Sequence, residues 1–108
     1  MSGSNMKMRL LAEKYEILRK KPFPVRGDVP NEIQRLHADM AVYSAESAGM
    51  ITRRLEGKRF WRYDRNPGIP NRIRSLLKRY PEHSQLLLQY QQTYNDIQEL
   101  IDLAEQTD

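Results

Sequence analysis

One segment in the middle of the chain combines the side chains best suited to binding a charged macromolecule. It places arginines beside aromatic residues: Arg59, Phe60, Trp61, Arg62, Tyr63 and Arg65. A guanidinium group can bind a carboxylate or phosphate through two hydrogen bonds, and an aromatic ring offers a large, rigid contact surface. We therefore expect these six residues to form a binding site, with another protein as the first candidate partner.

The same segment lies within a strongly basic stretch, which makes nucleic acid the second candidate partner. Residues 53–79 contain ten Lys and Arg but only two Asp and Glu. Cations neutralise phosphates while aromatic rings stack on unpaired bases. The chain has no ribonucleoprotein motif, zinc-finger spacing or clear helix-turn-helix pattern. A nucleic-acid-binding accessory or regulatory protein is therefore supported by composition and not by a motif.

A third use for the basic stretch is internal to the protein. The net charge of the chain is only +4, yet residues 80–108 contain six acidic residues and no Lys or Arg. Acids at steps of three from Asp96 to Asp108 repel one another unless cations offset them. The arginines could therefore pair with the acidic last helix, and Phe60 and Trp61 could then close one end of the core. The sequence leaves the plug and the binding surface as alternatives.

Nothing in the sequence is typical of an active site. The chain has no cysteine, no glycine-rich phosphate loop and no nucleophile elbow, and neither His37 nor His83 has a second metal ligand at helical spacing. We expect a non-enzymatic protein without catalytic residues, metal or cofactor. The absence of cysteine and of a long apolar run also predicts a cytoplasmic protein with no membrane segment.

Helices must position the arginine and aromatic segment. Apolar residues recur at steps of three and four over about residues 6–20, 31–55 and 87–104. Asn31 is expected to begin the long second helix, and Gly57 is expected to end it. A shorter helix should start at Pro70 and run to Tyr80, and Pro81 either kinks it or begins the next one.

These elements predict one all-α domain over residues 6–108, preceded by a flexible tail or expression remnant over residues 1–5. The expected architecture is a helical bundle built on a long antiparallel hairpin, with a short N-terminal helix. The hairpin should pair the helix around residues 33–55 with the one around residues 87–104, because the connection between them is short.

The last helix predicts a homodimer. Leucines flank its apolar seam and make that face wider than one partner helix covers: Leu86, Leu88, Leu100 and Leu103. A second copy related by two-fold symmetry could cover the excess. The proline-rich connection over residues 21–30 permits the first helix to join its own bundle or to pack on that second copy.

Overall fold

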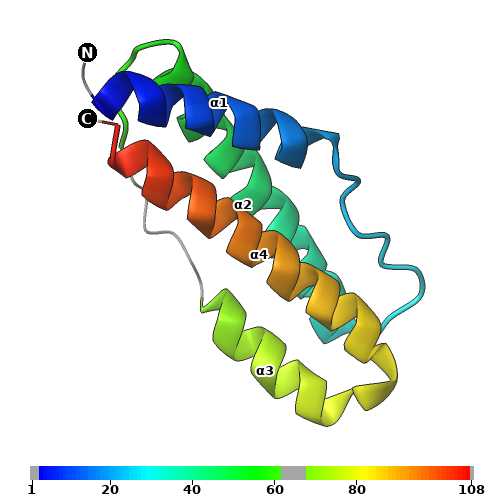
Figure 1. The fold of residues 1–108 in the computed structure, drawn as a ribbon. Coiled ribbons are helices and arrows are strands. Elements are labelled where there is room, and N and C mark those ends of the chain that lie inside the picture. The colour runs from blue at the N-terminus through cyan, green and yellow to red at the C-terminus, as the bar shows by residue number, and fades with distance from the viewer. Residues whose placement is uncertain (1–2, 62–67, 108) are drawn as a thin grey trace.

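The computed structural model describes residues 3–61 and 68–107, and these residues form a bundle of helices (Figure 1). The elements are α1 (Gly3–Lys20), α2 (Asn31–Leu55), α3 (Ile69–Arg79), a single 3-10 turn η1 (Pro81–His83) and α4 (Ser84–Glu105). The prediction of an all-α fold with a short N-terminal helix is confirmed, and no strand occurs in the described part of the chain. None of its helices is both long enough and apolar enough to span a membrane.

Helix α2 ends at Leu55, two residues before the glycine that the sequence indicated as its stop. Gly57 has a φ of +83°, a left-handed conformation that residues with a side chain rarely adopt. Its N–H donates to the carbonyl of Arg54, and the N–H of Lys58 donates to the carbonyl of Arg53, both at 3.0 Å. This pair of bonds is a Schellman motif, which satisfies carbonyls that the end of a helix leaves free.

The prolines set the limits of the later helices. Gly68 has a φ of +66° directly before α3, and Pro70 occupies the first turn of that helix. Pro81 begins the separate turn η1 rather than kinking α3, and the N–H of His83 donates to the carbonyl of Tyr80 at 2.9 Å. The chain thus reverses direction between α3 and α4 through a short, locally bonded corner.

Helix α1 begins at Gly3, earlier than the expected start at Met6. Residues 3–5, which were predicted to belong to a flexible tail, are therefore helical in the structure. Small polar residues are well tolerated in the first turn of a helix, and no proline interrupts the segment. The apolar periodicity, which begins only at Met8, does not mark this end of the helix.

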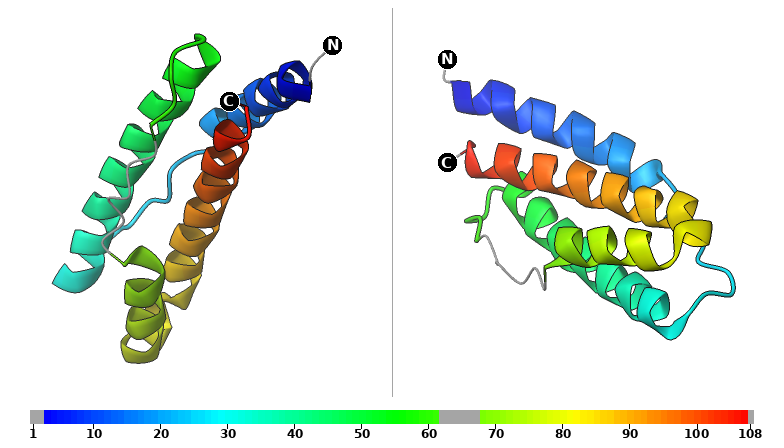
Figure 2. Two further views of the ribbon diagram at one scale, coloured as in Figure 1. Left: turned by 90° about the vertical axis from the view of Figure 1, so that its left-hand side faces the viewer. Right: turned by 90° about the horizontal axis from the view of Figure 1, so that it is seen from below.

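The four helices alternate in direction, so the two longest run parallel to each other (Figures 1 and 2). Three contacts between α2 and α4 advance in the same direction: His37 to Tyr90, Tyr43 to Gln98, and Arg54 to Thr107. These contacts show that α2 and α4 run parallel, which corrects the expected antiparallel pairing of the two helices. Helix α3 adds a second reversal of the chain. The antiparallel neighbours are therefore α1 with α2, α1 with α4, α2 with α3, and α3 with α4.

Helix α4 lies at the centre of the bundle and contacts all three other α-helices. Its broad apolar face is therefore covered within the chain. Leu100 is buried, Leu86 and Leu103 pack half-buried against the core, and only Leu88 of the four flanking leucines is largely exposed. The width of this face, from which the sequence predicted a homodimer, is explained by three covering helices instead.

Candidate functional site

The structure separates the two aromatic residues at the centre of the predicted site. Phe60 is only 7 % exposed and belongs to the hydrophobic core, whereas Trp61 is 55 % exposed. The role of Phe60 as a binding anchor is therefore corrected, because its ring is already packed inside the protein as the plug interpretation required. Trp61 lies on the surface. The remaining predicted site residues, Arg62, Tyr63 and Arg65, lie outside the described residues.

Arg59 stacks on the exposed tryptophan. Its guanidinium carbon lies 4.4 Å from the centroid of the Trp61 ring, which is the geometry of a cation–π interaction. A guanidinium group stacked in this way keeps N–H donors in its plane, and these can still bind a carboxylate or phosphate. The pair therefore combines an apolar surface with a positive charge.

Arg54, near the end of α2, fixes the backbone that leads to Arg59 and Trp61. Arg54 donates from Nη1 to the carbonyl of Lys58 at 3.1 Å, which holds the first residues of the connection. It also donates from Nε to the hydroxyl of Thr107 at 2.6 Å and from Nη2 to the carbonyl of Thr107 at 2.9 Å. These bonds tie the start of the connection between α2 and α3 to the end of α4. The burial of Phe60 anchors the same connection directly before Trp61.

Two further arginines of the basic stretch serve the packing of α3 on α2. Arg72 Nη1 lies 2.7 Å from Asp39 Oδ2, and Arg79 forms an ion pair with Glu32. The bond from Arg79 lowers the pKa of the Glu32 carboxyl, and the Tyr80 hydroxyl donates to the same carboxylate. The sequence predicted acidic partners on the last helix for such arginines, but these two pair with acids of α2. Acid spacing along one helix does not reveal which neighbouring helix faces it.

Six cations of the basic stretch are exposed among the described residues. Three of them have a contact within the chain: Lys58 with Glu56, Arg59 with Trp61, and Arg79 with Glu32. The other three are Arg53, Arg74 and Lys78, whose side chains form no hydrogen bond or ion pair with the rest of the described chain. Arg74 and Lys78 are one turn apart on α3, so their charges lie on the same face of that helix. Together with Arg59 and Arg53, they are the described cations of the basic stretch that remain open to an anionic partner.

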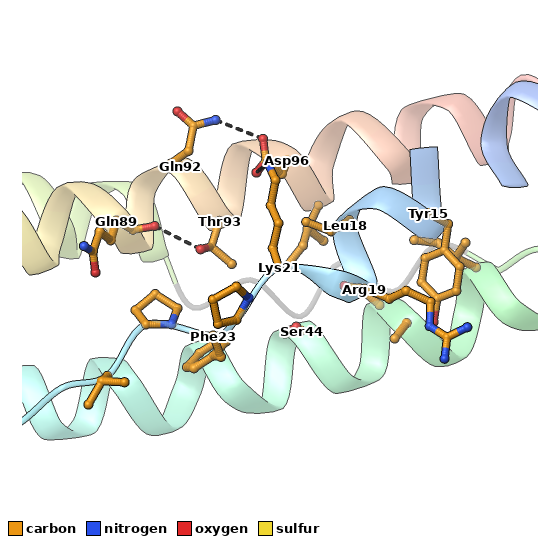
Figure 3. A pocket seen from close by; sticks show the side chains of 17 residues that line it. Tyr15, Leu18, Arg19, Lys21, Phe23, Ser44, Gln89, Gln92, Thr93 and Asp96 are labelled. Carbon is orange, nitrogen blue, oxygen red and sulfur yellow. Dashed lines mark hydrogen bonds and ion pairs between the residues drawn. The ribbon is translucent and has the colours of Figure 1, made fainter. Parts of the chain in front are cut away.

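The structure also contains a cavity that the sequence did not indicate. It measures about 630 Å³ and lies between the end of α1, the proline-rich connection, α2 and α4 (Figure 3). Its apolar wall includes Leu18, Phe23, Ile51 and Ile97. Because the wall is assembled from four separate segments, no periodicity within one helix could reveal it.

Two serines of α2 line this cavity, Ser44 and Ser47. Ser47 is 1 % exposed, and its hydroxyl oxygen is buried without a hydrogen-bond partner. Ser47 occupies a position in the apolar stripe of α2, between Tyr43 and Met50, where a large apolar residue would fill the space. A small polar residue in this stripe was the available sequence signal for the cavity.

An ion pair lies across the cavity wall. Lys21 Nζ is 3.3 Å from Asp96 Oδ2, and Gln92 donates to the other oxygen of the same carboxylate at 2.9 Å (Figure 3). Asp96 is one of the acids of the last helix, and its cation comes from the connection after α1. The basic stretch over residues 53–79 does not supply it.

A partly buried polar contact joins α2 to α4 near the proline-rich connection. Nδ1 of His37 lies 2.6 Å from the hydroxyl of Tyr90, and the ring of Phe23 packs edge-on against the imidazole with ring centroids 5.1 Å apart. Burial, together with the charge of Arg26, lowers the pKa of His37, and burial raises the pKa of Tyr90 to about 12. This pair bridges two helices, and the described residues contain no cluster of three or more metal-binding side chains around it or elsewhere.

Comparison with protein-family models, with curated proteins and with solved structures finds no match to this chain. Function must therefore be inferred from the two surfaces described above: the stacked pair of Arg59 and Trp61, and the cavity beside Ser47.

Proposed function

We propose that the protein is a small, non-enzymatic interaction module that binds a protein partner through Trp61 and Arg59. The exposure of Trp61 beside the buried Phe60 is the observation that carries this proposal. Tryptophan and arginine supply much of the binding energy in protein interfaces, and a side chain that is held in place loses less entropy on binding. Arg62, Tyr63 and Arg65 complete the proposed surface on the basis of their sequence positions. We further propose a cytoplasmic location, for which the lack of cysteine is the supporting feature.

A quantitative pull-down with matched variants tests the proposed surface. Trp61→Ala and Arg59→Ala should each reduce the retained amount of the same bound proteins by about tenfold, the loss expected when a central contact is removed. Val42→Ala is the matched control, because Val42 is a largely exposed apolar side chain on α2 and lies outside the proposed surface. If the two site variants retain every partner that the wild type and the control retain, the proposal is wrong.

Phe60→Ala separates a folding effect from a binding effect. Since Phe60 is buried, its truncation should lower the free energy of unfolding by about 3 kcal/mol, whereas Trp61→Ala should change it by less than about 1 kcal/mol. Urea unfolding followed by circular dichroism measures both values. Equal losses for the two variants would show that Trp61 is also a core residue in solution.

Nucleic acid is the second candidate partner, favoured by the exposed cations Arg53, Arg74 and Lys78. An electrophoretic shift assay with single-stranded RNA and DNA at low salt tests it. Binding should weaken steeply with salt, and the double variant Arg74→Gln, Lys78→Gln should reduce the salt slope by about 1 to 2. The absence of a complex at micromolar protein would remove this alternative.

We still propose a homodimer, but the feature that supports it is now an exposed apolar face of α1 and not the apolar face of α4. Met6, Leu10 and Ile17 are exposed on α1 at steps of four and seven, which places them on one face. Light scattering of the wild type and of Leu10→Glu tests whether this face joins two copies. A monomeric wild type at the highest usable concentration would exclude the dimer.

A further inference from the structure

The cavity beside Ser47 has the size of a small-molecule site. Its volume of about 630 Å³ falls within the range of about 300–1,000 Å³ that is typical of ligand pockets. Leu18, Ile51 and Ile97 supply apolar wall from three different helices. The body of a ligand that fills this space is therefore mainly apolar.

One buried group in the cavity lacks a partner. The Ser47 hydroxyl is almost fully buried and forms no hydrogen bond, which is costly for a polar group removed from water. Ser44, one turn earlier on α2, brings a second, half-buried hydroxyl to the same wall. A ligand with a carbonyl or hydroxyl group at this depth would supply the missing partner.

The charges around the cavity are already compensated. Three charged residues line it, and each is in an ion pair: Lys21 with Asp96 at 3.3 Å, and Arg19 with Glu16 at 3.3 Å. An ionised ligand would lose its hydration without gaining an unpaired opposite charge from this wall. The charge pattern therefore favours an uncharged ligand.

The rim of the cavity is stiffened by its sequence. Residues 21–25 form one edge, and two of them, Pro22 and Pro24, have a restricted φ and no N–H that would need a partner (Figure 3). Phe23 turns between them toward His37. A site whose edge is already fixed loses little entropy when a ligand binds.

We propose that this cavity binds a small, uncharged, mainly apolar molecule whose single carbonyl or hydroxyl group hydrogen-bonds to Ser47. The site is separate from the surface around Trp61, so it represents a second binding activity of the same chain.

A neutral fluorescent ketone tests the proposal directly. The probe 6-propionyl-2-(dimethylamino)naphthalene has an apolar body and one carbonyl group, and its emission shifts to shorter wavelength in an apolar site. The wild type should bind it at one site per chain. Ser47→Ala should weaken binding about fivefold, the effect of one hydrogen bond, and its melting temperature should be unchanged or higher because a buried unpaired hydroxyl is removed.

Two matched variants separate a filled cavity from a general surface effect. Ala48→Phe places a ring in the cavity wall and should weaken probe binding more than tenfold, whereas Ala41→Phe, on an exposed part of the same helix, should bind as the wild type does. Trp61→Ala should also bind normally. The anionic probe 8-anilinonaphthalene-1-sulfonate should bind more weakly than the ketone. No saturable ketone binding, unchanged binding by Ser47→Ala, or tighter binding of the anion would each overturn the proposal.

Discussion

The two sides of the pair formed by α2 and α4 are covered in different ways. On one side, the 11-residue helix α3 buries Ile69, Ile73 and Leu76 and adds ion pairs to α2. On the other side, the 18-residue helix α1 contributes Leu11 to the fully buried core among its described side chains, and the large cavity remains beside it. A longer helix therefore closes its side of the bundle less completely than a shorter one.

The connections that lead to the two helices account for this difference. Helix α3 joins α4 through the short corner at Tyr80 and Pro81, which places it directly against its neighbour. Helix α1 joins α2 through the extended, proline-rich residues 21–30, and part of this connection forms the cavity rim instead of a packed contact. The α3 side therefore contributes more to the packing of the fold, and the α1 side keeps the space of the cavity.

The largest expected effect is a difference in stability between truncations on the two sides. Ile73→Ala should lower the free energy of unfolding by about 3 kcal/mol, because it removes a buried side chain from a filled space. Leu18→Ala should cost only about 1 kcal/mol, because Leu18 is half-buried and already borders a cavity. Urea unfolding measures both values, and equal losses would show that the two sides are packed equally well in solution.

An intermediate effect is expected from the ion pairs. A double-mutant cycle on Arg72 and Asp39 should give a coupling energy of about 0.5–1 kcal/mol, since the arginine is largely covered and the contact is 2.7 Å long. The same cycle on Lys21 and Asp96 should give about 0.3 kcal/mol or less, because Lys21 is 57 % exposed. A stronger coupling across the cavity than across α3 would reverse the comparison.

The smallest expected effect is on the way the free energy of unfolding changes with pH. Burial lowers the pKa of His37 from 6.5, so the unfolded chain binds the proton more readily than the folded chain just below that pH. The contribution of neutral His37 to stability is therefore present above pH 6.5 and is lost as the pH falls through the lowered pKa. Arg26, Tyr90 and Phe23 are the groups that face it.

His37→Gln tests this contribution because glutamine can still form a hydrogen bond with Tyr90 but does not titrate. Urea unfolding between pH 7.5 and 5.5 should show a smaller loss of stability for the variant than for the wild type. Parallel profiles for the two proteins would exclude a coupling of His37 protonation to folding.

The helices themselves could be predicted from the sequence, because apolar periodicity and the residues Gly57, Pro70 and Pro81 act locally. The relative direction of α2 and α4 could not. Periodicity identifies the buried face of each helix, but either direction of packing buries the same face. The helix over residues 70–80 was itself predicted, but its 11 residues form a complete antiparallel neighbour and not part of a short connection between α2 and α4.

The candidate site was predicted only in part, for a similar reason. Composition drew attention to Phe60 and Trp61, but whether each ring is buried or exposed depends on the turn at Gly57 and on the bonds of Arg54. The cavity was missed because its residues are far apart in sequence. Ser47 is an unusual residue in an apolar stripe, but its position alone does not show that three other segments surround a cavity beside it.

The parallel packing of α2 and α4 has an electrostatic consequence at the end of the bundle where the C-termini of both helices lie. Each helix carries about half a negative charge at its C-terminus, so two such ends side by side repel each other. The guanidinium group of Arg54 donates to the carbonyl of Lys58 beyond α2 and to the carbonyl of Thr107 beyond α4. A single guanidinium group therefore places its positive charge beside both helix ends, and this part of the basic stretch acts as a counterion within the fold.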